Sequence, residues 1–214
     1  MDIAEIVSNI VMIEKGFQHI LDAANQIVTF YTEEECFDIA LDLFNNQSYQ
    51  LRMLSTSLLG YVAVKNENAL SFLRDKVSCD DNWRVQEMLA KSFDCICKER
   101  GYEISLPLIS EWLEDNRPNV VRAVTEGLRI WTSRPYFKEH PSVAIAFLSK
   151  HKSNPSEYVR KSVGNALRDI SKKFPQLVFD ELTTWNQDDL HIRFTYQLAI
   201  KHIHKKPFVD SKME

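Results

Sequence analysis

Arginine follows an aliphatic residue at regular intervals along the chain, and this spacing is the first pattern with chemical consequences. The pairs are Leu51-Arg52, Val121-Arg122, Val159-Arg160 and Ile192-Arg193. Between the first two, Val85-Gln86 repeats the pattern with glutamine in place of arginine. Arg129 and Arg168 follow seven and eight residues after Arg122 and Arg160, so each of these pairs lies on roughly one face of a helix. A row of guanidinium groups of this kind could bind the phosphates of a nucleic acid backbone.

The charge distribution supports an anionic partner for one half of the chain. The 214 residues carry 26 Lys and Arg against 30 Asp and Glu, a formal net charge of −4 that alone argues against nucleic acid. Residues 1–107 hold 9 basic and 17 acidic side chains, whereas residues 108–214 hold 17 and 13. The first half therefore has a net charge of −8 and the second half of +4. This asymmetry is typical of chains in which one half binds an anion.

The elements that position these arginines are predicted to be helices. Only 5 Gly and 7 Pro punctuate the chain, and no long segment alternates polar and apolar residues with period two. Residues 32–45 start with Thr32 and place Glu35 three positions later, a capping-box pattern, and then carry apolar residues at spacings of three and four. Residues 157–171 have the same apolar stripe. We therefore expect an all-α protein.

The intervals between these five positions, Gln86 included, are 33 to 38 residues and also indicate internal repeats. Each unit holds one helix before a polar turn and one after it, as in 104–115 and 118–133. Two helices in about 40 residues are typical of HEAT-type repeats, which stack into a curved α-solenoid. We expect about five repeats, with the second helices lining a concave basic face. The predicted single domain, 1–214, comprises an N-terminal helical cap, repeats and a C-terminal tail, at 1–31, 32–206 and 207–214.

The repeated arginines also have a structural interpretation. In repeats of this type, the arginine commonly bonds to the turn aspartate or asparagine of a neighbouring unit and forms a ladder. The sequence leaves both interpretations open for Arg122, Arg129, Arg160, Arg168 and Arg193.

One segment and the repeat pattern together resemble a known family. The repeat length, the number of units, the arginine placement and the segment DDNWRVQEMLAKSF resemble the HEAT-like-repeat DNA alkylation repair proteins, which are bacterial DNA glycosylases. The resemblance covers about residues 30–206. It implies that duplex DNA binds to the concave face and that cationic N3- and N7-alkylated purines are excised without a metal. Arg122 and Arg168 match family positions that face DNA.

The catalytic motif implied by the resemblance is only partly present. The family motif is Trp-Asp-x-Val-Asp, in which the Trp and the final Asp contact the damaged nucleotide and stabilise a sugar that develops positive charge. Trp83 matches its Trp, Glu87 stands at its final Asp, and Arg84 replaces its first Asp. Glu87 is one methylene longer than Asp, and a displacement of about 1 Å can lower a rate on the order of a hundredfold. Asn165 stands where the family has a second tryptophan.

These departures predict a DNA-binding protein in which base excision is lost or much weakened. An active glycosylase that uses Glu87 and Trp83 is the first alternative, and a protein-interaction scaffold is the second. Trp83 could instead be a packing residue beside the turn. Glu87 could be a solvated carboxylate or a partner of Arg84 or Lys91.

No cofactor or metal is expected. The sequence lacks the glycine-rich nucleotide loops and the G-x-S-x-G nucleophile motif. Cys95 and Cys97 are two positions apart, so on a helix they point to different faces. We read all four cysteines as reduced thiols of a cytoplasmic protein, with no membrane partner and a monomeric state.

Overall fold

The computed structural model describes residues 2–205, and every regular element within that range is helical. The all-α prediction is therefore confirmed. Residues 206–214, which include the predicted C-terminal tail 207–214, lie outside the described residues. Among the residues described, no helix combines the length and apolarity needed to cross a membrane.

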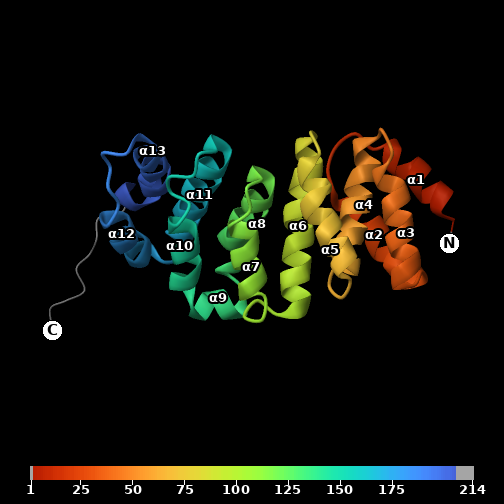
Figure 1. The fold of residues 1–214 in the computed structure, drawn as a ribbon, viewed down its shortest axis with the longest axis horizontal. Helices are drawn as coiled ribbons and strands as arrows, with labels where there is room; N and C mark the ends of the chain where they lie inside the picture. Colours follow the sequence, from red (N-terminus) through yellow and green to blue (C-terminus); the bar gives the residue numbers. More distant parts are fainter. Residues whose placement is uncertain (1, 206–214) are drawn as a thin grey trace. The chain divides into compact units, whose positions relative to one another are not determined.

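The chain divides into two compact units, residues 1–107 (unit 1) and 108–214 (unit 2). This division coincides with the change from net negative to net positive sequence. Unit 1 contains α1 (Ile3–Val11), α2 (Gln18–Phe30), α3 (Glu33–Phe44), α4 (Tyr49–Val62), α5 (Glu67–Asp75), a short 3-10 helix (Val77–Cys79) and α6 (Trp83–Arg100). Unit 2 contains α8 (Pro118–Trp131), α9 (Pro135–Glu139), α10 (Pro141–Ser149), α11 (Glu157–Ile170), α12 (Pro175–Thr183), α13 (Leu190–Ala199) and a 3-10 helix (Ile200–Lys205), while α7 (Leu106–Leu113) begins at the boundary (Figure 1).

Five helix pairs follow α1 and α2 in the described part of the chain. They are α3/α4, α5/α6, α7/α8, α10/α11 and α12/α13. The second helix of each pair carries one of the repeated positions, which are Arg52, Gln86, Arg122, Arg160 and Arg193. The expected number of repeats is thus confirmed. The assignment of 1–214 to a single domain stays a prediction.

Local sequence signals define the helix ends. Glu35 donates its backbone N–H to the Thr32 hydroxyl at 3.3 Å, and the Thr32 N–H donates to the Glu35 carboxylate at 2.8 Å. The predicted capping box is therefore present. The hydrogen bond from the Thr32 backbone lowers the pKa of Glu35. Pro118 stands at the first position of α8, where its missing N–H leaves no helical hydrogen bond unmade.

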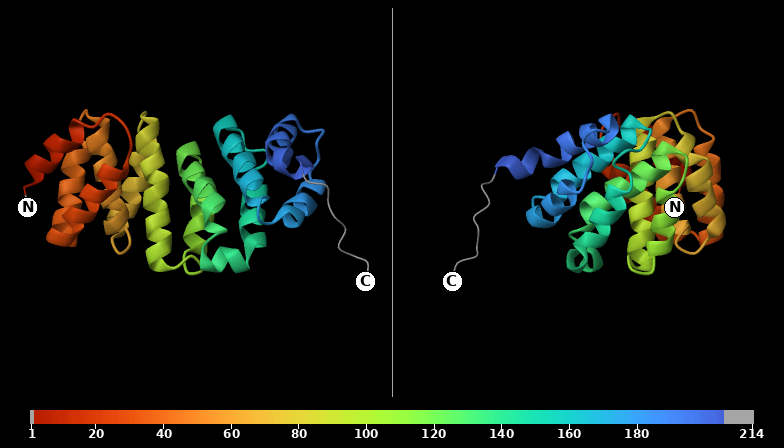
Figure 2. Two further views of the ribbon diagram at one scale, coloured as in Figure 1. Left: turned by 180° about the vertical axis from the view of Figure 1, so that it is seen from behind. Right: turned by 60° about the vertical axis from the view of Figure 1, so that its left-hand side comes forward.

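The second helices pack together inside each unit (Figure 2). In unit 1, α4 packs against α2, α3 and α6, and Ser92 donates its hydroxyl to the Thr56 carbonyl at 2.7 Å. In unit 2, α11 packs between α8 and α13, and the Thr125 and Ser162 hydroxyls are 2.7 Å apart. Small side chains permit these approaches, because a Cβ on Gly60 would lie 2.7 Å from the Ser92 Cβ. The core of each unit is thus centred on one second helix.

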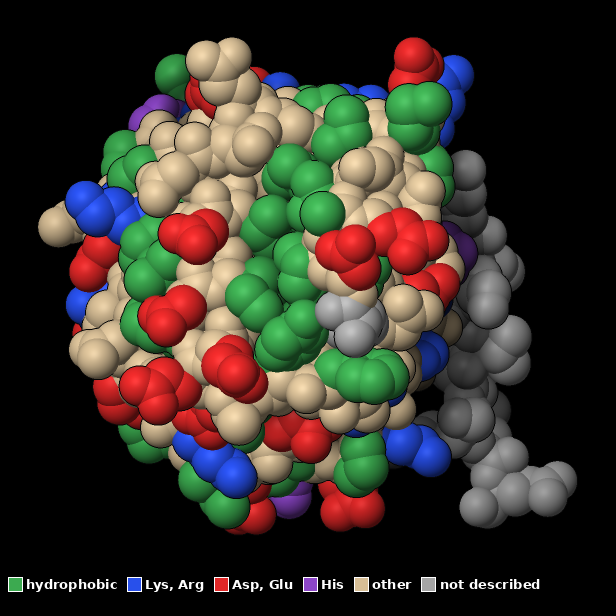
Figure 3. Space-filling view, turned by 90° about the vertical axis from the view of Figure 1, so that its right-hand side faces the viewer, with side chains coloured by type: hydrophobic (Ala, Val, Ile, Leu, Met, Phe, Trp, Pro, Cys, Tyr) green, Lys and Arg blue, Asp and Glu red, His purple; other side chains and the backbone are tan. Residues whose placement is uncertain are grey.

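The N-terminal end of unit 1 is acidic. Figure 3 faces this end, which is formed by α1, α2 and α3, and shows a strip of hydrophobic side chains with acidic side chains on both sides. The carboxylates of α1, α2 and α3 are exposed; they belong to Glu5, Asp22, Glu33, Glu34, Glu35, Asp38 and Asp42. Such a surface repels an anionic partner.

Candidate nucleic-acid interface

The repeated arginine position has a recurring structural role. In the second helices α4, α6, α11 and α13, its side chain donates a hydrogen bond to the backbone carbonyl six residues earlier. These bonds run from Arg52 to Asn46 (3.1 Å), Gln86 to Asp80 (2.8 Å), Arg160 to Asn154 (2.6 Å) and Arg193 to Gln187 (2.8 Å). Each bond fastens the turn that precedes its own helix. Gln86 makes the same contact as the arginines, which explains why glutamine can stand at that position.

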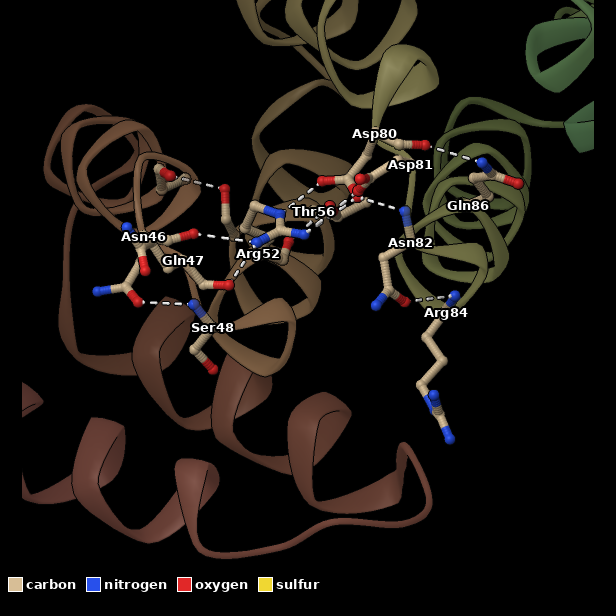
Figure 4. A network of polar contacts seen from close by, with 12 residues as sticks. Asn46, Gln47, Ser48, Arg52, Thr56, Asp80, Asp81, Asn82, Arg84 and Gln86 are labelled. Atoms are coloured by element: carbon tan, nitrogen blue, oxygen red, sulfur yellow. Dashed lines mark hydrogen bonds and ion pairs between the residues drawn. The ribbon is translucent and has the colours of Figure 1, made fainter.

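Arg52 additionally links two successive repeats (Figure 4). Its Nε and Nη2 atoms donate to the two carboxylate oxygens of Asp80 at 2.6 and 3.2 Å. The Asp80 side chain is only 4% exposed and lies in the turn before α6. A buried carboxylate needs a paired charge and hydrogen bonds to be tolerated. The ladder interpretation is therefore correct for Arg52 and Asp80.

The predicted phosphate ligands at the start of the second helices differ in exposure. Arg160 is only 7% exposed, and its Nη1 donates to the carbonyls of both Asn154 and Pro155. Arg122 is also buried, and its guanidinium carbon lies 4.9 Å from the centre of the Tyr158 ring. Arg193 is exposed. These contacts favour a structural role for Arg160 and leave Arg193 accessible to a ligand.

The predicted ligands in the last turns of α8 and α11 form part of a basic cluster, which we define as Arg129, Arg168, Lys172 and Lys173. Asp169 lies among them: Arg129 forms an ion pair with it, Lys172 Nζ is 2.7 Å from its carboxylate, and Arg168 Nε is 3.5 Å away. Burial raises the pKa of Asp169, but the hydrogen bond from Lys172 and the charge of Arg129 outweigh burial and lower it overall. Arg129 also pairs with Glu126 at 3.3 Å. The four cations exceed these two carboxylates, so the cluster keeps a net positive charge.

Trp83 and Glu87 line one cavity of about 240 Å³ in unit 1. The lining residues are Gly16, Phe17, Met53, Trp83, Arg84, Glu87, Met88 and Lys91. Asn82 caps α6 by accepting the Arg84 N–H at 3.0 Å, and Trp83 is therefore the first residue of the helix. Trp83 is 58% exposed, whereas Trp112, Trp131 and Trp185 are buried. The four-residue spacing thus places the two predicted catalytic residues at one cavity.

Two cations lie against the aromatic rings of this cavity. The guanidinium carbon of Arg84 is 4.6 Å from the centre of the Trp83 ring and 5.2 Å from that of Tyr49. Lys91 Nζ is 4.0 Å from the centre of the Phe17 ring. Our sequence analysis missed Phe17, which precedes the segment that resembles the family. The position of Lys91, two turns after Arg84 on α6, could have indicated a shared face.

Asn165 lies in α11 of unit 2 and is partly exposed. Its neighbour Gly164 packs closely on α13, since a Cβ there would lie 2.6 Å from the Leu198 Cβ. No aromatic ring is supplied at the Asn165 position.

Comparison with known proteins identifies the family. The profile of the family described as DNA alkylation repair enzyme matches residues 18–203. The chain belongs to this family. The crystal structure of AlkD2 from Streptococcus mutans is 48% identical with a TM-score of 0.90, and the match covers 94% of this chain and 96% of that one. A structure of smu.31 from Streptococcus mutans UA159 is also 48% identical, with a TM-score of 0.85 and coverage of 87% and 92%.

A curated relative, YhaZ from Bacillus subtilis (strain 168), is 35% identical over 99 residues, which represent 44% of this chain. The matched segment spans only 28% of the length of YhaZ. Together with the five helix pairs, the family membership confirms the predicted α-solenoid of HEAT-like repeats.

Proposed function

We propose that this family member binds duplex or structured DNA and that its base excision is lost or much weakened. The observation that carries this proposal is the Arg84 guanidinium, which lies 4.6 Å from the centre of the Trp83 ring. In the chemistry that the family resemblance implies, this ring and a nearby carboxylate face a cationic nucleotide. Here the protein supplies its own cation to the ring.

Electrostatics disfavour a cationic base in this cavity. Arg84 and Lys91 contribute two positive charges to the lining, and Glu87 contributes one negative charge. Two like charges about 6 Å apart repel each other by about 0.7 kcal/mol in water and about 3 kcal/mol at a dielectric constant near 20. A cation–π contact is worth about 0.5–2 kcal/mol, so displacing either cation has its own penalty. The cavity therefore opposes the charge that an excising enzyme must attract.

The catalytic side chains also depart from the implied motif. Glu87 is a methylene longer than the expected aspartate, and Asn165 offers no aromatic face to a developing cation. The active-glycosylase alternative requires Glu87 to stabilise the sugar cation with Trp83 as its aromatic partner. Their shared cavity is compatible with that role, so activity must be measured directly.

The basic cluster supports the DNA-binding part of the proposal. Arg129 and Lys172 are substantially exposed, and the cluster lies at the C-terminal ends of α8 and α11 in the positively charged unit. Phosphate contacts by Arg129, Arg168 and Arg193 would release counterions and make the affinity depend steeply on salt. We expect the chain to act as a monomer in the cytoplasm, without metal or cofactor.

An excision assay tests the loss of activity. Duplex DNA that contains 7-methylguanine or 3-methyladenine is incubated with the protein, and the released base is quantified by chromatography. We expect release at the rate of spontaneous depurination. Robust excision that Glu87→Ala abolishes would overturn this part of the proposal and establish the glycosylase alternative.

A salt titration tests DNA binding. Fluorescence anisotropy of a labelled duplex should show affinity that falls steeply as salt rises. Arg129→Ala with Arg168→Ala should reduce the log–log salt slope by about 2, since each phosphate contact contributes about 0.9. Lys161→Ala is the matched control, because Lys161 is an exposed cation of α11 paired with Glu157. Weak, salt-independent binding would instead favour the protein-interaction scaffold.

A further inference from the structure

A second cavity of unit 1, which we call the Tyr61 cavity, has a volume of about 410 Å³. Its wall is formed by the C-terminal ends of α2, α4 and α6 and by the start of α3. Glu99 of this wall stands sixteen residues after Trp83 on α6, so about 24 Å of helix separates the two residues (Figure 1). The Tyr61 cavity is therefore distinct from the cavity that Trp83 and Glu87 line.

Apolar and aromatic residues form much of the wall of the Tyr61 cavity. Val28, Val62 and Val64 line it together with Tyr31 and Tyr61. Tyr61 is 36% exposed, so part of its ring remains open to a ligand. The volume of the cavity lies within the roughly 300–1,000 Å³ of small-molecule sites, which combine apolar surface with a few polar groups. The hydrocarbon part of a small ligand would lose contact with water here, and this burial favours binding.

The charged residues of the wall give it a net negative charge. They are two carboxylates and one ammonium, on Glu33, Glu99 and Lys65, and all three residues are exposed. The negative potential reaches the buried Cys36, because burial raises the pKa of its thiol and the charges of Glu35 and Glu33 raise it further. The last turn of α2 holds no basic residue, so the C-terminal carbonyls of this helix add partial negative charge. The wall therefore attracts a cation.

We propose that the Tyr61 cavity binds a small organic cation, an ammonium group carried on a hydrocarbon body. The ammonium pairs with the carboxylates of Glu33 and Glu99, and the π electrons of Tyr31 and Tyr61 attract it as well. The valine side chains cover the hydrocarbon body. This binding is independent of the proposed DNA contacts, and its test contains no DNA.

Lys65 gives the proposal a second, opposite consequence. Its ammonium repels a bound cation, but Lys65 is exposed and its flexible stem lets the charge move into water. Replacing Lys65 with a neutral residue should therefore strengthen the binding of a cation, whereas neutralising Glu33 or Glu99 should weaken it. A cavity that bound ligands through hydrocarbon contacts alone would show neither effect.

A matched pair of probes tests the charge preference. 2-Phenylethylammonium and 2-phenylethanol have nearly the same shape and differ in the charge of the terminal group. Amide NMR spectra of the isotope-labelled protein, recorded during titration with each probe, report both affinity and location. We expect the ammonium to cause saturable shifts in residues 31–36 and 61–65 and to bind about fivefold more tightly than the alcohol, since one net charge at about 4 Å attracts it in water.

Substitutions in the wall should change the affinity for the ammonium and leave that for the alcohol unchanged. Glu33→Gln and Glu99→Gln should each weaken binding of the ammonium about fivefold, and Lys65→Gln should strengthen it by about the same factor. Tyr61→Leu should weaken it about threefold through loss of the aromatic face. Glu34→Gln is the matched control, because Glu34 is an exposed carboxylate of the same first turn of α3 and does not line the cavity.

Three results would overturn the proposal. The first is equal affinity for the ammonium and the alcohol. The second is the absence of saturable shifts at residues 31–36 and 61–65 with the ammonium. The third is equal weakening by Glu34→Gln and Glu33→Gln, which would show that the net charge of the surface, and not the cavity, attracts the cation. None of these results affects the proposed DNA binding, which the salt titration measures separately.

Discussion

Arg160 donates from Nη1 to the carbonyl oxygen of Asn154 at 2.6 Å, six residues before it in the chain. The same guanidinium nitrogen also donates to the carbonyl of Pro155. The guanidinium carbon of Arg160 lies 5.5 Å from the centre of the Phe194 ring. Because Arg52, Gln86 and Arg193 make the same six-residue contact, this position holds the turn before α4, α6, α11 and α13. Arg160 makes this contact from a buried position, whereas Arg193 makes it from an exposed one, so burial distinguishes the arginine that only maintains the fold.

Arg160→Ala should therefore lower stability more than it lowers DNA affinity. The Asn154 and Pro155 carbonyls would lose a charged donor that is itself buried, and hydrogen bonds to charged groups contribute about 1.5–3 kcal/mol. Urea unfolding followed by circular dichroism should show a loss of about 2–4 kcal/mol, whereas the neighbouring exposed Lys161→Ala should change stability by less than about 0.5 kcal/mol. A stable Arg160→Ala protein with much weaker DNA binding would assign Arg160 to the phosphates instead.

Gly60→Ala should destabilise unit 1 through the contact of α4 with α6. The new Cβ would lie 2.7 Å from the Ser92 Cβ and 2.9 Å from its Cα, so the backbone of α6 would have to move. Overpacking costs about 1–3 kcal/mol and exceeds the helix-propensity gain of about 1 kcal/mol. Combining Gly60→Ala with Ser92→Gly should lose less than the sum of the single changes in thermal unfolding. Strict additivity would show that the two residues are not in contact.

Cys79 should be the only rapidly modified thiol of the native protein. It is exposed, whereas Cys36 and Cys97 are buried. Burial raises the pKa of Cys95 to about 11, and burial also raises the pKa of Cys97, so neither forms a thiolate near neutral pH. Titration with a chromogenic disulfide reagent should detect one fast thiol, which Cys79→Ser removes and Cys95→Ser leaves. A second fast thiol in native protein would reveal local opening of α3, if it is Cys36, or of α6, if it is Cys95 or Cys97.

Much of the fold could be predicted because it depends on local signals. The Thr32–Glu35 capping box, the apolar stripe of 157–171 and the turn clusters act over a few residues, and they correctly predicted α3 and α11. The repeat length followed from the arginine spacing. The role of those arginines could not be predicted from their spacing, because a guanidinium group can donate to a carbonyl or to a phosphate equally well. The sequence did contain a signal for the structural role: the repeated position stands six residues after a turn residue, as Arg160 does after Asn154.

The candidate cavity could be predicted only in part. Trp83 and Glu87 share a helix face by spacing alone, and the cavity contains both. The Phe17–Lys91 contact joins the N-terminal segment to α6, and nothing in either local sequence specifies that pairing. The sequence showed that Arg84 replaces the first Asp of the family motif. Its position over the Trp83 ring, however, depends on the side-chain conformation. The net charge of the cavity lining therefore could not be predicted from the sequence alone.

Asp169 should make stability sensitive to acid. Burial opposes its ionisation, yet the Lys172 hydrogen bond and the Arg129 charge lower its pKa below the ordinary value. The ionised carboxylate therefore stabilises the folded protein fully above about pH 4, and this contribution disappears as the pH falls through the lowered pKa. Asp169→Asn should be less stable near neutral pH and lose less stability on acidification. An unchanged pH profile, measured by urea unfolding, would show that the ion pairs contribute nothing to folding.

The same substitution should strengthen DNA binding. Asp169 neutralises part of the charge of Arg129, Arg168 and Lys172, so removing it exposes about one more effective cation to the phosphates. One charge at about 4 Å contributes about 1 kcal/mol in water, which corresponds to about a fivefold gain in affinity at low salt. Asp180→Asn, which removes an equal charge at an exposed position of α12, is the control in the same anisotropy titration. If both variants gain equally, net charge alone explains the effect and the basic cluster is not the binding surface. A gain confined to Asp169→Asn, with a steeper salt slope, would locate the phosphates at the ends of α8 and α11.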